Sequence, residues 1–291
     1  LHDGHVLEIG ERRECGLVFR NPTRGVFGTA GLPDFMAWNS VEKLPWWWEP
    51  FHHVWFTIPA ILIIPAALAF LLGYANFRRR VSGVYFAIVT LSVSAIMAIV
   101  IIGQQGLTGG INGITDFKTF LGLDLDNDRA KLVMYFVTAV LLLCIVAAGQ
   151  FILRSRLGRV LVAIRDGGDR VRFTGYDSAM FQAFVFAVAA LFAAIGGAMF
   201  TIQIGLASPA LVGIIPSIEM VIYAAVGGRL SLIGAVYGAF LVNLAKTFFS
   251  ENFVEYWIYF IGALFVIVVM FLPKGLVGIL DYFRGGSKSE R

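Results

Sequence analysis

The sequence predicts an all-α polytopic membrane protein with six to seven transmembrane helices, one of them short, and one further helix outside the membrane. Of its 291 residues, 58% are hydrophobic and 14% are charged. A soluble domain of this length does not need so apolar a composition. The apolar residues also gather in runs of roughly 20, the length that a helix needs to cross about 30 Å of hydrocarbon.

Six runs have this spanning length. In chain order they are 56–74, 81–102, 132–153, 181–204, 230–249 and 253–272. A seventh, shorter candidate covers residues 211–226 and carries Gly213, Pro216 and Glu219. Such residues interrupt a regular apolar helix, so this segment is expected either to span as a short helix or to form a broken, re-entrant one among the others.

Basic residues alternate between the loops. They gather at 78–80, in six arginines within 154–172, at Arg229 and in the C-terminal tail, whereas the loops between these are acidic or uncharged. Short basic loops face the cytoplasm. We therefore expect residues 154–180 and the C-terminus to be cytoplasmic, and this asymmetry accounts for the net charge of +4 without nucleic acid.

Three regions follow from this arrangement. Residues 1–54 form an extramembrane N-terminal segment, residues 55–283 the transmembrane domain, and residues 284–291 a cytoplasmic tail. The first 30 residues are too polar to span a membrane. The sequence therefore predicts either a truncated start or a divergent one.

Catalytic motifs are absent from the sequence. It has no Gly-x-x-x-x-Gly-Lys-Ser/Thr loop for nucleotide phosphates, no Gly-x-Ser-x-Gly elbow and no His-Glu-x-x-His pair. Its four histidines have no partners at a usual metal-ligand spacing. We expect no catalytic residue, no metal site and no cofactor in this chain.

Polar residues near the membrane are the next candidates, because such residues usually face a pathway or one another. Five glycines and several amides fall within 103–117, too many for a regular helix. Irregular backbone at this depth is tolerated only when it is buried in protein or lines a wet cavity. This cluster is therefore either the outer mouth of a polar solute path or an exposed loop. The candidate path residues are Gln104, Gly109, Gly110, Asn112, Gln203 and Glu219.

Glu219 admits two interpretations. It either lines a path or gate, or it is a structural carboxylate satisfied by a hydroxyl, a backbone donor or a cation such as Lys246. The small residues at 193–198 and the pair Gly234 and Gly238 predict close helix packing instead of chemistry.

The basic segment 154–177 is the most informative stretch. Leu157, Leu161 and Ile164 recur at helical spacing, while Arg159 and Arg165 point elsewhere. The pattern predicts an amphipathic helix that ends at the two glycines 167–168. Such a helix either lies on the membrane surface or docks on a soluble partner.

Several stretches together carry a family resemblance. Residues 155–166, Ser-Arg-Leu-Gly-Arg-Val-Leu-Val-Ala-Ile-Arg-Asp, resemble the cytoplasmic coupling loop of LivM-type ABC importer permeases, the branched-chain amino acid family. Residues 81–90, 106–117, 217–229 and 273–277 agree with the same family. The sequences of residues 32–36, 44–48 and 217–222 are most similar to the urea-transporter branch of this family.

The resemblance implies a permease subunit in the bacterial inner membrane, with urea as the first expected solute and a branched-chain amino acid as the next. It implies four kinds of partner: cytoplasmic ATP-binding subunits that hold the ATP, a second homologous permease, a periplasmic solute-binding protein and the lipid bilayer. The residues implied in coupling to the ATPase are Leu157, Gly158, Arg159, Leu161, Ala163, Ile164, Arg165 and Asp166.

An ion-coupled secondary transporter is the alternative. It would need several intramembrane carboxylates or paired broken helices in two related halves. The sequence offers Glu219 and no clear internal repeat. A structural membrane scaffold is a weaker possibility, because the polar residues gather near the ends of spans.

Overall fold

Long helices make up most of the structure, a computed structural model. It describes residues 45–46, 49–81, 83–115, 119–120, 123–124, 127–173, 175–228 and 231–252, with five single residues between 259 and 270. The expectations for residues 1–44 and 284–291, and nearly all of the predicted span 253–272, lie outside the described residues.

Six of the described long helices follow the apolar runs, and the remaining one follows the basic amphipathic segment. They are α3 (Val54–Arg78), α4 (Val84–Gly103), α6 (Asp128–Arg154), α7 (Arg156–Phe173), α8 (Ser178–Ile204), α9 (Ile214–Gly227) and α10 (Leu232–Asn252). Shorter elements connect them: η1 (Glu49–His52), α5 (Gln105–Thr108), η2 (Gly110–Asn112), β1 (Ile114–Thr115), β2 (Thr119–Phe120), β3 (Leu123–Asp124), β4 (Leu206–Ala207) and η3 (Pro209–Leu211).

Among the described residues, six helices are long and apolar enough to cross a membrane. Five of them coincide with spans predicted from the sequence, and the sixth is the short candidate, which runs through η3 and α9. The fold class is therefore confirmed as all-α and polytopic. The described strands are two residues long and form two antiparallel pairs, which do not alter that class.

Of the two forms that the residues of the short segment left open, the structure shows a short helix. Helix α9 has 14 residues, which corresponds to about 21 Å at 1.5 Å per residue and is less than the hydrocarbon thickness. Pro216 is its third residue. A proline is tolerated there because the first N–H groups of a helix have no partner within the helix.

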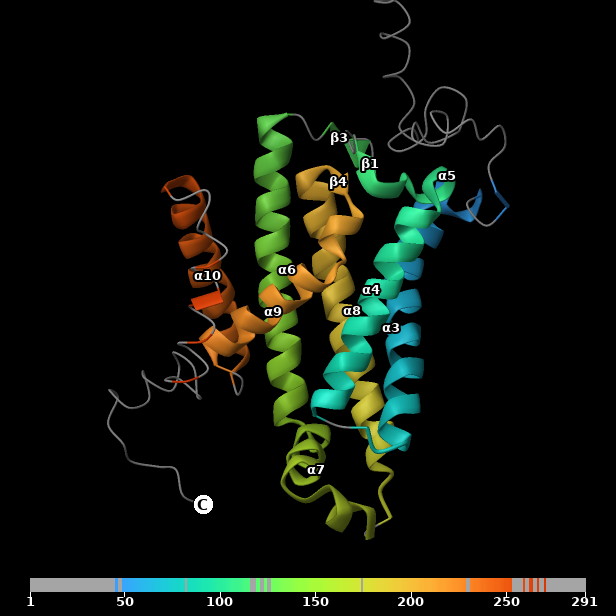
Figure 1. The fold of residues 1–291 in the computed structure, drawn as a ribbon, viewed down its shortest axis with the longest axis vertical. Coiled ribbons are helices and arrows are strands. Elements are labelled where there is room, and N and C mark those ends of the chain that lie inside the picture. Colours follow the sequence, from blue (N-terminus) through green and yellow to red (C-terminus); the bar gives the residue numbers. More distant parts are fainter. Residues whose placement is uncertain are drawn as a thin grey trace, which may run out of the picture. The chain divides into compact units, whose positions relative to one another are not determined.

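The chain divides into two units, which we describe separately. The first contains residues up to 145 together with 158–211, and the second contains 146–157 and the residues from 212 onward. In the first unit α3 packs along α8 (Figure 1). Small residues lie at this contact: Ala183 of α8 is fully buried, and a Cβ at Gly73 of α3 would lie 3.5 Å from the Ala183 Cα. Small residues let helices approach closely where lipid supplies no hydrophobic driving force between them.

An aromatic cluster ties α4 to that pair. Phe77 of α3 and Phe86 of α4 stack with ring centroids 4.9 Å apart, and Phe186 of α8 meets Phe86 edge-on at 5.4 Å. Elsewhere α4 has no buried residue, and the apolar side chains of Val84 and Tyr85 are strongly exposed. Apolar surface of this extent needs lipid or another subunit to cover it.

In the second unit α9 and α10 cross at glycines. A Cβ at Gly227 would meet the backbone of Gly234, and one at Gly238 would meet Tyr223 and Gly227. The predicted packing role of Gly234 and Gly238 is therefore confirmed. The small-residue run 193–198 behaves differently, because a Cβ at Gly196 or Gly197 meets nothing within 4 Å in the described part of the chain.

Candidate functional site

The glycine-rich cluster forms a tight, irregular turn after α4. Helix α4 ends at Gly103, and Gly109, Gly110 and Gly113 all have positive φ angles between 60° and 75°. Glycine adopts this region at little cost, whereas a side chain there is strained. Thr108 closes the turn by donating its hydroxyl toward the carbonyl oxygens of Ile101, at 2.6 Å, and Gln104, at 2.9 Å.

The turn packs on the segment that follows α8. Strand β1 pairs antiparallel with β4, so that Ile114 lies opposite Ala207. Gly109, Gly110 and Gly113 are buried, and a Cβ at Gly113 would strike the Ala207 carbonyl. The cluster is thus not simply an exposed loop. Its glycine backbone is enclosed by protein, as irregular backbone at membrane depth requires.

Two amide side chains of the cluster are exposed. Gln104 separates α4 from α5, and Asn112 ends η2 between the buried Gly110 and Gly113. The structure therefore brings four of the predicted path residues into one turn, in which Gly109 and Gly110 are buried and Gln104 and Asn112 are exposed. Whether a solute contacts these amides stays a prediction.

Gln203 has a packing role. It lies on the last turn of α8 and donates its amide to the Thr138 hydroxyl at 2.7 Å and toward the Met134 carbonyl at 3.4 Å, both on α6. Thr138 was not predicted from the sequence. A hydroxyl in mid-span can be satisfied by its own helix, so the sequence does not announce a partner on another helix.

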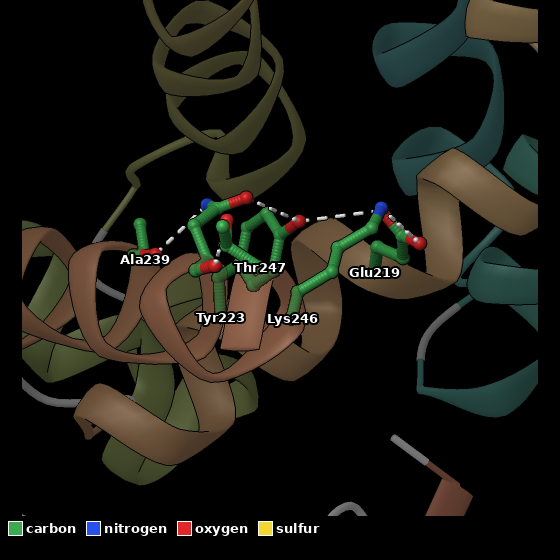
Figure 2. Close-up of polar contacts among 6 residues, drawn as sticks. Glu219, Tyr223, Ala239, Lys246 and Thr247 are labelled. Carbon is green, nitrogen blue, oxygen red and sulfur yellow. Dashed lines mark hydrogen bonds and ion pairs between the residues drawn. The ribbon is translucent and has the colours of Figure 1, made fainter. Parts of the chain in front are cut away.

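Glu219 lies in the second unit, within a polar network between α9 and α10. Its two carboxylate oxygens accept from the Lys246 ammonium at 2.9 and 3.0 Å, and Figure 2 shows the lysine extended toward the glutamate. Tyr223 donates its hydroxyl toward the same carboxylate at 3.2 Å. The side chains of Glu219 and Lys246 are 18% and 33% exposed, so each charge is largely withdrawn from its surroundings.

Further bonds hold this network on α10. Asn243 donates its amide to the Ala239 carbonyl at 2.8 Å, and its carboxamide oxygen lies 3.4 Å from the Tyr223 hydroxyl. Thr247 donates to the Asn243 carbonyl at 3.1 Å. A hydroxyl has one proton, and the closer, charged carboxylate takes it in preference to the amide.

The network gives Glu219 the partners that the structural interpretation requires. Of the three kinds of partner considered, it has a cation and a hydroxyl. Sequence analysis named Lys246 but missed Tyr223, although a residue four positions after Glu219 lies on the same face of a helix. Glu219 belongs to a different unit from the other five path candidates.

The basic segment forms α7, and its backbone leaves the helical conformation at Gly167, with φ −168° and ψ 67°. This confirms the predicted end of the amphipathic helix. A second helical piece follows it to Phe173, which the sequence analysis did not predict.

Burial divides the predicted coupling residues of α7 into two groups. Gly158 and Ile164 are buried, and Leu157 and Leu161 are half-buried. Arg159, Ala163, Arg165 and Asp166 are exposed. Arg165 donates from Nε to the Asp166 carboxylate at 2.9 Å, and both side chains remain more than 60% exposed. Ile164 is therefore covered by this chain, whereas the charged residues Arg159, Arg165 and Asp166 are open to a partner.

Comparison with known proteins identifies a family over most of the chain. A family model described as the permease component of branched-chain amino acid transport systems matches residues 24–269. The high-affinity branched-chain amino acid transport system permease protein LivM of Escherichia coli is 27% identical over 81% of this chain and 61% of its own length, and the LivM protein of Salmonella typhimurium is 26% identical over the same shares.

A third relative is the corresponding permease protein BraD of Pseudomonas aeruginosa, 30% identical over 44% of this chain and 42% of its own length. The chain thus spans about three-fifths of the length of the first two relatives. No solved structure matches it.

Proposed function

This chain belongs to the family of branched-chain amino acid transport permease components, and we propose that it is a membrane-spanning subunit of an ABC importer in the bacterial inner membrane. The six membrane-length helices among its described residues supply the scaffold that such a subunit needs. In this proposal separate cytoplasmic ATP-binding subunits supply the energy. A second homologous permease completes the pathway, and a periplasmic binding protein delivers the solute. Family membership favours this class over the ion-coupled alternative.

The observation that carries the coupling part of the proposal is the exposed edge of α7. Gly158 and Ile164 anchor the helix on its own chain, while Arg159, Arg165 and Asp166 face outward. An anchored helix with an exposed charged edge can transmit a push from a partner to the rest of the chain. A helix held only by lipid would instead turn its apolar face to the membrane.

Arg165→Glu tests the coupling role. Because Arg165 is exposed, the substitution leaves folding and membrane insertion intact, and we expect solute uptake to fall at least about tenfold, as when a charged contact in an interface is reversed. Arg170→Glu, the same charge change beyond the Gly167 break, is the matched control. Solute-stimulated ATPase activity of the purified assembly should fall for Arg165→Glu and persist for the control. Equal effects of the two variants would contradict the coupling role.

Urea is the solute that we propose for the path. The support is the sequence similarity of residues 32–36, 44–48 and 217–222 to the urea-transporter branch. Of these three stretches, only the last lies fully within the described residues, on α9. The relatives carry branched-chain amino acid names, so leucine is the competing solute. Uptake of labelled urea and labelled leucine in a strain lacking the permease, with and without this chain, separates the two. Leucine uptake alone would overturn the urea assignment.

We also propose that Gln104 and Asn112 line the outer mouth of the path. Their amides are exposed beside a glycine turn whose backbone is buried, which is the arrangement expected where a polar solute meets a rigid rim. Gly109 and Gly110 shape that turn. The bond from Gln203 to Thr138 and the ion pair of Glu219 support a role for these two residues in holding helices together.

A further inference from the structure

A cleft opens in the first unit where the α3–α4 turn faces α7 and the start of α8. It has a volume of about 530 Å³. It is lined by Phe77, Arg80, Val81, Gly83, Phe86, Ile164, Gly168, Arg172, Ser178 and Gln182. The lining therefore combines basic and polar side chains with aromatic and aliphatic ones.

Arg80 occupies a backbone position that normally belongs to glycine. Its φ is 60°, and it is the one residue other than glycine with positive φ in the described part of the chain. The N–H of Arg80 bonds to the Phe77 carbonyl and that of Val81 bonds to the Asn76 carbonyl, both at 3.0–3.1 Å, which is the Schellman ending of a helix. Glycine would make this ending without strain. Arginine at this position strains the backbone, but it places a guanidinium at the cleft, which glycine cannot do.

Two exposed arginines line the cleft without an anionic partner in the described part of the chain. Within the described residues, no carboxylate forms an ion pair with Arg80 or Arg172. Ser178 and Gln182 add a hydroxyl and an amide one turn apart at the start of α8. Asp177 is the nearby acid, and its carboxylate is engaged in capping the Ala179 N–H at 3.0 Å.

The apolar residues of the lining favour a lipid over a small anion as the ligand. Phe77, Phe86 and Ile164 contribute a wall that a hydrated inorganic ion does not need. Directly after Gly83, the side chains of Val84 and Tyr85 are 73% and 76% exposed and lead onto the open face of α4. A headgroup phosphate in the cleft would have an apolar surface beside it for its acyl chains.

We propose that this cleft binds the phosphate of an anionic phospholipid headgroup, with Arg80 and Arg172 as its cationic ligands. Basic pockets between helices on the cytoplasmic side suit such headgroups. The orientation predicted from the basic loops puts the cleft at that leaflet. The bound lipid would brace α7 against the α3–α4 turn. The site would therefore lie on the same side of the membrane as the proposed coupling helix.

Native mass spectrometry of the full-length permease tests the site, after reconstitution with phosphatidylglycerol or with phosphatidylcholine. We expect retention of phosphatidylglycerol by the unaltered protein, and a loss of about tenfold in its occupancy in the double variant Arg80→Gly, Arg172→Gln, since two charge-assisted contacts are removed. Arg80→Gly suits the left-handed backbone, so the variant should fold normally. Arg79→Gln removes a charge from the same turn outside the cleft and should change occupancy less than about twofold.

Equal occupancy in the double variant and the unaltered protein would overturn the proposal, as would an equal loss in Arg79→Gln. Competition by inorganic phosphate against phosphatidylglycerol would support recognition of the phosphate itself. Binding of inorganic phosphate without retention of phosphatidylglycerol would overturn the lipid assignment. Loss of ATP-binding subunits from the purified assembly of the double variant, with lipid occupancy unchanged, would assign the cleft to the protein partner instead.

Discussion

The α9–α10 pair and the helix α7 both carry charges, but they hold them in opposite ways. In the pair, Glu219 is enclosed by Lys246 and the Tyr223 hydroxyl. On α7 the ion pair of Arg165 and Asp166 joins sequence neighbours and stays exposed. A charge in an apolar span must find partners within the protein, whereas a charge in water needs none. The first arrangement stabilises the fold, and the second leaves a surface for other molecules.

The largest effect should come from the backbone contact that brings the charged partners together. A Cβ in Gly238→Ala would collide with Tyr223 and Gly227, so we expect the helices to separate at a cost of about 3 kcal/mol. Thermal unfolding in detergent measures this. Gly197→Ala on α8 is the matched control, because a Cβ there meets nothing and should even stabilise its helix slightly. Similar melting temperatures for the two variants would contradict the close crossing.

Removing one partner of the enclosed ion pair should have the next largest effect. Lys246→Met leaves the Glu219 carboxylate without its cation, and because the pair is partly exposed we expect a loss of about 1–3 kcal/mol. The double variant Glu219→Gln, Lys246→Met removes both charges and should regain more than half of that loss. Transport by the double variant then separates the two interpretations of Glu219: retained uptake supports the structural one, and abolished uptake in a stable protein supports a path residue.

A neutral bond between spans should be weaker than the ion pair. The Gln203 amide and the Thr138 hydroxyl, 2.7 Å apart, should show a coupling energy of about 0.6 kcal/mol and not above roughly 1.7, the range for hydrogen bonds between membrane helices. A double-mutant cycle of Gln203→Leu and Thr138→Val measures it by unfolding. A coupling energy equal to that of the Glu219–Lys246 pair would remove the distinction between charged and neutral partners.

The smallest effect on stability should come from α7. Arg165→Gln breaks its bond to Asp166, yet both side chains are exposed, so the free energy of unfolding should change by less than about 0.5 kcal/mol. The same substitution should lower uptake if this edge contacts the ATP-binding subunit. Unfolding and uptake assays on one preparation compare the two. A stability loss as large as that of Lys246→Met would show that the exposed charges also hold the fold.

Several features could be predicted from sequence because they depend on local composition. Five membrane-length helices match the long apolar runs, and α9 lies largely within the shorter run 211–226. The Gly167 break likewise follows from two adjacent glycines after an amphipathic run. The packing role of Gly234 and Gly238 was predicted from spacing alone, since small residues four apart share a helix face.

Other features depended on which elements meet. The sequence left Glu219 with three possible kinds of partner, and it gave no sign that Thr138 receives Gln203 or that Ile164 turns toward its own chain. The contacts of Glu219 with Lys246 and of Gln203 with Thr138 join residues far apart in the chain, where periodicity carries no information.

What the sequence determined by itself is the class of the protein, its spans and the candidate coupling segment, because hydrophobic length and charge act locally against a bilayer. Only the tertiary structure decided that the glycine turn packs on β4, that Glu219 pairs with Lys246, and that Arg80 and Arg172 share a cleft. The reason is physical: pairing depends on distances across the fold, which are set by how helices pack and not by the residues that each helix contains.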